Sequence, residues 1–209
     1  MAYELNSEDL KNIKKKPLEN EISLKTLLEF YVDHLTGQYF IYTLEVEIAG
    51  KVETHEIKLL FEPSNLCHLL GFQHIFEGRA DAKSYEGQDG FQAIQLEKLT
   101  LATFKKDKVL LERYKQYRER ILYFPFIYKL LQTPSVVYFN KNQVGKRVRL
   151  ESDFIFYNPE NNRYIHLGID FHPSNPSYYF PRTFFVRKKD DYLQNQISAE
   201  VIQFEIKKL

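Results

Sequence analysis

The second half of the chain contains a succession of short β-strand patterns, and this succession constrains the fold most strongly. After residue 133, apolar and β-branched residues alternate with polar ones in five segments, which Asn, Pro and Gly turns separate. Consecutive strands joined by short turns favour an antiparallel sheet. The predicted strands are residues 135–139, 147–158, 163–172, 182–189 and 200–208.

The first 132 residues carry helical periodicity with one interruption of strand type. Apolar residues recur at helical spacing over residues 23–36 and 93–132, and Pro125 is expected to divide the second segment. Between them, residues 40–61 alternate around an Ala-Gly-Lys turn, which predicts a hairpin. Residues 64–71, from a Ser to a Gly, predict a short helix.

Together these patterns predict an α+β protein, with helices packed on a mainly antiparallel sheet and with an N-terminal helix and β-hairpin. At 209 residues one core can hold the whole chain, so we expect a single domain, residues 1–209. It would consist of a helix and hairpin (1–62), a helical part (63–132) and the sheet (133–209), with a soft boundary near residue 133. Residues 77–92, with three of the eight glycines, are expected to form an exposed loop.

Cysteine content and apolar runs indicate where the protein resides. The single cysteine, Cys67, excludes an intramolecular disulfide and fits a reducing cytosol. The first 16 residues are charged throughout, and no segment approaches the roughly 18 consecutive apolar residues of a membrane span. We therefore expect a cytoplasmic protein with no membrane partner. No Gly-rich phosphate loop, G-x-S-x-G elbow or H-E-x-x-H helix is present, so no cofactor is expected.

Charge is unevenly distributed along the chain. The net charge is only +1, which argues against a uniformly basic nucleic-acid binder. Residues 140–189 nevertheless hold nine Lys or Arg against four Asp or Glu. This local excess of positive charge could steer an anion.

His68 lies within the most unusual short segment, NLCHLLGFQHIF at residues 65–76. An imidazole titrates near neutral pH and can act as a general acid or base. A histidine flanked by Cys67, Leu69 and Leu70 is also typical of a buried, hydrogen-bonded packing residue. From the local sequence both interpretations stay open, and packing is the commoner case.

A second group of ligand-type residues lies in the segment HLGIDFH. His166, Asp170 and His172 fall on one face of a predicted strand, which suggests a metal-dependent hydrolase as one alternative. One strand does not make three side chains converge, and few other ligand types accompany them. No metal is therefore expected.

Four segments together resemble a known nuclease family. They are LCHLLGF on a short helix after a strand, the basic strand GKRVRLESDFIFYN, the following YIHLGID, and the ending YYFPRTFFV. This set is similar to the phage-associated barnase/EndoU/colicin/RelE-like nucleases (PBECR), fourth subgroup, over about residues 60–190. The pieces His-Leu-Leu-Gly and Pro-Arg-Ser/Thr-Phe-Phe carry most of the resemblance, and Thr183 stands where the family has Ser. Residues 1–60 lie outside it.

The resemblance implies helices on an antiparallel sheet and metal-independent cleavage of RNA to a 2′,3′-cyclic phosphate. It also implies a toxin of a bacterial mobile element or phage. The substrate would be RNA, single-stranded or tRNA, and a cognate inhibitor protein would be a further candidate partner.

Metal-free RNA cleavage needs a base for the 2′-hydroxyl proton, cations for the charged phosphorane and an acid for the leaving 5′-oxygen. His68 is the candidate acid or base. Arg147 and Arg149 project from one face of a predicted strand, beside Lys146, and could grip adjacent phosphates. A solvated strand face is the alternative.

Arg182 and Thr183 follow the aromatic run SYYFP. A cation, a hydroxyl and aromatic rings suit an unstacked nucleotide, whereas those rings could equally fill the core. Asp153 would either orient a basic group or cap a turn. The predicted catalytic residues are His68, Arg147, Arg149, Arg182 and Thr183, and the predicted substrate-binding residues are Lys146, Asp153, Tyr178 and Tyr179.

The sequence therefore predicts a ribonuclease, with one rival from another class. A non-catalytic module of the same fold, which binds RNA or a partner protein, would agree with the near-neutral total charge. Toxicity on expression would distinguish the enzyme from the binding module.

Overall fold

The computed structural model describes residues 4–144 and 150–209. Lys146, Arg147 and Arg149, which the sequence analysis selected as phosphate-binding residues, lie outside the described residues. Contacts divide the described chain into two compact units. The helical unit is Met1–Thr36 with Glu62–Tyr128, and the barrel unit is Gly37–Phe61 with Lys129–Leu209.

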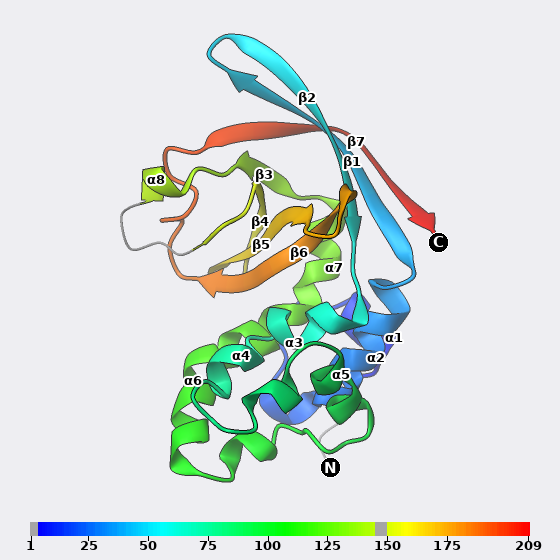
Figure 1. The fold of residues 1–209 in the computed structure, drawn as a ribbon, viewed down its shortest axis with the longest axis vertical. Helices are drawn as coiled ribbons and strands as arrows, with labels where there is room; N and C mark the ends of the chain where they lie inside the picture. The colour runs from blue at the N-terminus through cyan, green and yellow to red at the C-terminus, as the bar shows by residue number, and fades with distance from the viewer. Residues whose placement is uncertain (1–3, 145–149) are drawn as a thin grey trace. The chain divides into compact units, whose positions relative to one another are not determined.

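The helical unit is built from several helices, of which α6 (Lys108–Tyr123) is the longest (Figure 1), and polar side chains cap three of them. Asn6 and Ser23 accept hydrogen bonds from backbone N–H groups of the first turns that follow them, and the Asp107 carboxylate accepts one from Leu110 N at 2.8 Å. The α-helices are α1 Ser7–Lys11, α2 Leu24–His34, α3 Leu66–Leu69, α4 Phe72–Ile75, α5 Gly87–Gln95 and α6 Lys108–Tyr123, followed in sequence by α7 Ile127–Gln132. The 3-10 helices are η1 Glu19–Glu21, η2 Pro63–Asn65, η3 Ala82–Tyr85, η4 Thr103–Lys105 and η5 Phe124–Phe126.

Two predictions about these helices need correction. Residues 77–92, expected to form an exposed loop, contain η3 and the start of α5, whose Phe91 is buried. The long helical pattern from residue 93 becomes continuous helix only at Lys108, where Asp107 supplies the cap. Pro125 does divide the later segment, because it lies in η5 between α6 and α7.

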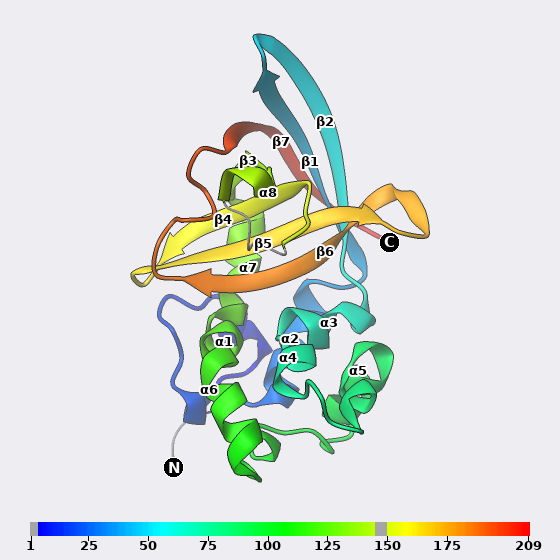
Figure 2. The same cartoon turned by 60° about the vertical axis from the view of Figure 1, so that its left-hand side comes forward.

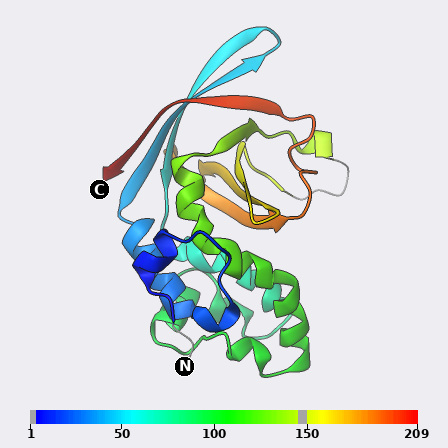
Figure 3. The same cartoon turned by 180° about the vertical axis from the view of Figure 1, so that it is seen from behind.

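Aromatic side chains fill the interior of the helical unit. The Phe104 ring lies 5.4 Å from Phe72, 5.8 Å from Phe76 and 5.1 Å from Tyr114, and all four rings are buried. Figure 3 shows α1 beside α2, and the Ser7 hydroxyl joins the two helices by donating to the Asp33 carboxylate at 2.6 Å. The high Phe and Tyr content thus serves packing here.

In the described part of the barrel unit, seven strands close into a barrel in the order β1-β2-β6-β5-β4-β3-β7 (Figure 2). All neighbours pair antiparallel except β2 and β6, which meet in parallel at Leu59 and Tyr179. The strands are β1 Gln38–Ile48, β2 Lys51–Leu60, β3 Ser135–Tyr138, β4 Phe154–Glu160, β5 Arg163–His172, β6 Asn175–Arg187 and β7 Ile197–Lys208, and a short helix, α8 Lys141–Val144, follows β3.

The α+β class and the mainly antiparallel pairing are confirmed, but the closed barrel replaces the expected open sheet. The barrel closes because the N-terminal hairpin joins the C-terminal strands in one sheet. Strand β1 pairs with β7, and β2 pairs with β6. β6 also begins seven residues before the predicted start at 182, because the segment NPSYYFP continues the strand despite its two prolines. Among the described residues, no helix is long and apolar enough to cross a membrane.

Tyr42 occupies the centre of the barrel packing. Its ring lies 4.9 Å from both Phe156 and Phe204, and its hydroxyl donates to the Leu131 carbonyl at 2.5 Å. On the other side of β3 and β4, the buried residues Val137 and Ile155 form a separate apolar cluster. The sheet is therefore covered on both faces near the ends of β3 and β4. Asp153, which directly precedes β4, lies at this end of the sheet.

Candidate functional site

The His-Leu-Leu-Gly motif forms α3 and the turn to α4 in the helical unit. Leu66, Cys67 and Leu69 of α3 are fully buried, whereas His68 is exposed. The interpretation of His68 as a buried packing residue is therefore wrong. The His68 imidazole therefore lies at the surface of the helical unit, on a helix that its buried neighbours anchor.

A β-bulge in the barrel unit sets the direction of Arg182. Gly168 of β5 pairs with Thr183 of β6, and the next residue, Ile169, pairs with Pro181, so Arg182 is an extra residue on its strand. Bulges of this kind re-aim side chains and are common near active sites. The bulge explains where the Arg182 guanidinium lies. The sequence motif predicts Arg182 as a site residue but gives no sign of the bulge.

Arg182 connects two carboxylates from different parts of the barrel unit. One guanidinium nitrogen lies 3.6 Å from Asp170 Oδ2, and another lies 3.6 Å from Glu151 Oε2. The Arg182 side chain remains 42% exposed. A half-exposed guanidinium that two carboxylates orient can still contact an anion from solvent.

Two hydroxyl groups lie next to this bulge. A Cβ atom placed on Gly168 would collide with Ser152 Oγ and would come within 3.0 Å of the Thr183 methyl. Gly168 is thus the residue that lets Ser152 and Thr183 approach each other across β5.

Asp153 and Asp170 form an interacting pair of carboxyl groups. Burial, and then the charge of Asp170 and a hydrogen bond with it, raise the pKa of the Asp153 carboxyl to about 6. The Oδ2 atom of Asp153 is buried, and no donor among the described residues reaches it. Protonation of Asp153 relieves the repulsion between the two carboxyl groups, which is why its pKa is raised.

Aromatic and imidazole groups surround the carboxyl pair. Tyr179 is 4% exposed, and its pKa is raised by burial and then by the charges of Asp153 and Asp170. Its ring packs on Phe171 at 4.2 Å, so most of Tyr179 serves the core, while Tyr178 is half-buried. The charge of His55 opposes the rise in the Asp153 pKa, which places the imidazole of β2 near the pair.

The carboxyl pair borders a pocket of about 380 Å³. Lys141 of α8 lies 3.6 Å from Glu151 and adds a second cation at the rim. We call this group the barrel site; it consists of Asp153, Asp170, Arg182, Glu151, Lys141, Ser152, Thr183 and Tyr179. It can bind an anion, and it can give or take a proton near pH 6.

The structure thus brings together four of the predicted site residues, Arg182, Thr183, Asp153 and Tyr179. His68 belongs to the other unit. Sequence analysis missed the pairing of Asp170 with Asp153 and the roles of Glu151 and Lys141, because these contacts join residues from separate segments.

The residues of the metal-dependent alternative do not converge. His166 is fully buried, its ring stacks 4.4 Å from that of Phe185, and burial lowers its pKa to about 4. His172 instead lies against Tyr178, at 4.8 Å. Within residues 4–144 and 150–209, no group of three or more His, Cys, Asp or Glu side chains is arranged to hold a metal ion.

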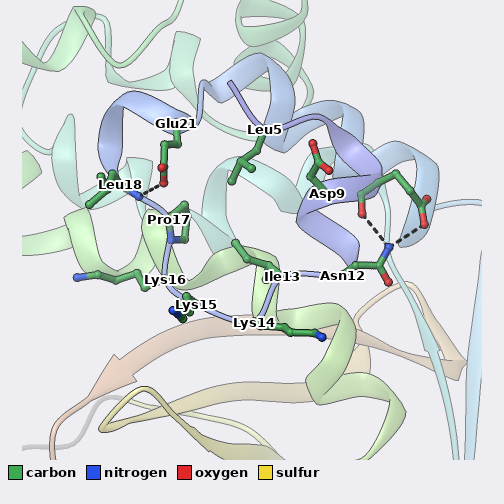
Figure 4. A pocket seen from close by; sticks show the side chains of 11 residues that line it. Leu5, Asp9, Asn12, Ile13, Lys14, Lys15, Lys16, Pro17, Leu18 and Glu21 are labelled. Atoms are coloured by element: carbon green, nitrogen blue, oxygen red, sulfur yellow. Dashed lines mark hydrogen bonds between the residues drawn. The ribbon is translucent and has the colours of Figure 1, made fainter. Parts of the chain in front are cut away.

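A second pocket, of about 640 Å³, lies in the helical unit (Figure 4). Lys14, Lys15 and Lys16 line it, and Lys16 is paired with Glu119 at 3.0 Å. Glu8, Asp9 and Glu21 also contribute to its walls. Both sites mix the two signs of charge, but the barrel site in addition holds a carboxyl whose pKa is raised to about 6, so it is the stronger candidate for acid–base chemistry.

Comparison with known proteins gives one result. Searches among curated proteins and among solved structures found no match. A protein-family model matches residues 23–208, which include α3 with His68 and every strand of the barrel. The chain therefore belongs to the PBECR4 family, described as "phage-Barnase-EndoU-ColicinE5/D-RelE like nuclease4".

Proposed function

We propose that this protein is a metal-independent endoribonuclease. Membership in a nuclease family supports cleavage of a phosphodiester. The observation that carries the proposal is the barrel site, where Asp153, with a pKa raised to about 6, lies beside Asp170, and Asp170 lies beside Arg182. Acid–base groups and a fixed cation are what RNA cleavage without a metal requires.

The reaction we propose proceeds by internal attack. The 2′-oxygen of the ribose bonds to phosphorus as a base removes its proton, and the bond from phosphorus to the 5′-oxygen breaks as an acid protonates that oxygen. The products are a 2′,3′-cyclic phosphate and a free 5′-hydroxyl. The Asp153 carboxyl, whose pKa is raised to about 6 beside Asp170, is suited to give or take a proton in this reaction.

The other predicted residues receive roles in the same scheme. His68, exposed on α3, is proposed as a general acid or base. Arg182, Arg147 and Arg149 would stabilise the charged phosphorane, and Thr183 would donate a hydrogen bond to it. The proposed substrate-binding residues are Lys146, Asp153, Tyr178 and Tyr179.

The biological setting extends the proposal. Because the family is described as phage nucleases, we propose that this protein is a cytoplasmic toxin of a bacterial mobile element or phage. We further propose that it has a barnase/EndoU/RelE-like fold. Its substrate would be single-stranded RNA or tRNA, and its second partner a cognate inhibitor protein.

Incubation of the purified protein with total RNA in EDTA tests the proposal. Wild type should cleave RNA, while His68→Ala and Arg182→Gln should lose most of the activity. Gln95→Ala and Arg187→Gln, at exposed positions of the same two units, are matched controls that should keep it. Absence of cleavage by wild type, or equal cleavage by His68→Ala, would remove the proposal.

A non-catalytic RNA- or protein-binding module is the second candidate. The net charge of +1 favours it, and so do the two carboxylates that already compensate Arg182. Expression without an inhibitor separates the candidates. A nuclease should be toxic and His68→Ala should relieve the toxicity, whereas a binding module should be harmless in both forms.

A further inference from the structure

A second arginine, Arg120 of α6, occupies a space that a glycine provides. Gly71 ends α3 with a φ of 84°, and a Cβ atom there would lie 3.2 Å from Arg120 Cδ, 3.2 Å from Arg120 Nη1 and 3.3 Å from Tyr117 Cδ1. A side chain at position 71 would therefore press on the guanidinium as well as strain the backbone. The last residue of His-Leu-Leu-Gly thus makes room for Arg120.

Arg120 lacks a counter-ion within the described structure. Its Nη1 atom is buried and has no hydrogen-bond partner. Burial lowers the pKa of the guanidinium to about 10, so it stays charged at neutral pH. The adjacent acid, Glu119, is paired with Lys16.

Two other arginines of the helical unit, Arg79 and Arg118, do have carboxylate partners. Arg79 lies 2.9 Å from Asp81, and Arg118, two residues before Arg120, lies 2.7 Å from Glu19. A half-buried guanidinium whose buried Nη1 atom has no acceptor is unfavourable in the free protein, and such groups cluster at functional sites. The missing negative charge is therefore expected to come from a ligand.

Two rings complete the surroundings of Arg120. Its guanidinium carbon lies 5.5 Å from the centre of the Tyr117 ring, and His74 stacks on that ring at 5.0 Å with an interplanar angle of 11°. Burial, and then the charge of Arg120, lower the pKa of His74, so this imidazole is neutral at neutral pH. A neutral imidazole adds hydrogen-bonding atoms without adding positive charge.

We propose that Arg120 binds a backbone phosphate of an RNA ligand at the turn between α3 and α4. The guanidinium fork matches phosphate oxygens, and the neighbouring rings offer faces for a base. The same turn carries His68, since Gly71 N donates to the His68 carbonyl at 3.0 Å. The inference rests on the proposed ribonuclease function for the identity of the ligand.

A non-cleavable ligand tests this proposal. Fluorescence anisotropy would follow binding of a labelled 2′-O-methyl oligoribonucleotide to the full chain across a range of salt concentrations. Arg120→Met should bind about tenfold more weakly, with a salt dependence reduced by about one phosphate contact. Arg118→Met, which removes an exposed arginine from the same helix, should bind like wild type.

Thermal unfolding distinguishes a binding role from a structural one. Because Arg120→Met removes a charge that lacks a counter-ion, its thermal unfolding midpoint should equal or exceed that of wild type. Inorganic phosphate should raise the unfolding midpoint of wild type more than that of Arg120→Met. Arg120→Lys, which keeps the charge without the fork, should fall between the two in affinity. The proposal would be overturned if Arg120→Met bound the oligoribonucleotide as tightly as wild type does. A lower thermal unfolding midpoint together with unchanged binding would show that Arg120 has a structural role instead.

The same experiments separate this proposal from the ribonuclease. Cleavage of RNA by wild type, together with full binding by Arg120→Met, would reject only the phosphate site. Tight binding of the 2′-O-methyl ligand that Arg120→Met loses, without any cleavage of RNA by wild type, would support the phosphate site and reject the enzyme.

Discussion

Replacement of Asp153 by Asn should make the protein more stable at neutral pH. The folded state raises the pKa of this carboxyl from its ordinary value of 3.8 to about 6, first by burial and then through Asp170. The folded protein therefore holds a proton that the unfolded chain has released between about pH 4 and pH 6, and its stability falls as the pH rises through this window. A shift of about two units corresponds to at most about 3 kcal/mol, and partial solvent exposure reduces the expected penalty to about 1–2 kcal/mol.

Asparagine cannot ionise, so Asp153→Asn removes this penalty above pH 6 and has little effect near pH 4. Urea unfolding at both pH values measures the difference. The midpoint of Asp153→Asn should exceed that of wild type at pH 7.5, and the two should converge near pH 4, while the exposed Asp191→Asn follows wild type at both.

The pKa of His166, lowered to about 4, contributes stability that is present above its ordinary value of 6.5 and is lost as the pH falls toward 4. This contribution is common to wild type and Asp153→Asn, so it cancels in the comparison. A lower midpoint for Asp153→Asn at pH 7.5, or a pH dependence equal to that of wild type, would refute the raised pKa of Asp153.

Three further substitutions or reactions test the packing around the site. Gly168→Ala should destabilise the barrel by about 1–3 kcal/mol in thermal unfolding, because the added methyl collides with Ser152 Oγ; an unchanged midpoint would contradict the close approach. Tyr42→Phe should cost about 1–2 kcal/mol in urea unfolding, since the Leu131 carbonyl loses its donor; an unchanged midpoint would contradict this hydrogen bond. Cys67, which is buried and whose pKa is raised to about 12, should react with a thiol reagent only after unfolding; rapid reaction of the native protein would show that α3 is not packed as described.

Much of the fold could be predicted because the local patterns are strong. The alternation in residues 40–61 and 163–172 corresponds to strands, and Pro125 separates two helices. Barrel closure could not be predicted, because it depends on β1 pairing with β7, about 160 residues later in the chain. Strand periodicity specifies which face is buried but leaves the partner undetermined.

The candidate site was predictable only in part, for a related reason. Arg182, Thr183 and Asp153 stand in short motifs, so a linear pattern could single them out. Arg120 lies in an ordinary amphipathic helix, and its contact with Gly71, its buried Nη1 atom and the ion pair that Arg118 makes with Glu19 distinguish the two arginines only in the folded structure. Whether an arginine has a carboxylate nearby depends on three-dimensional packing, so it cannot be predicted from the spacing of residues in the sequence.

The central claim is that the 2′-hydroxyl of RNA is the nucleophile and that no metal takes part. Cleavage of an end-labelled oligoribonucleotide in EDTA, compared with the same oligomer carrying a single 2′-deoxy sugar at the cut position, tests this claim directly. The account predicts a 2′,3′-cyclic phosphate product from the first oligomer and no cleavage at that position in the second. Equal cleavage of both oligomers, or cleavage only after a divalent metal is added, would contradict it.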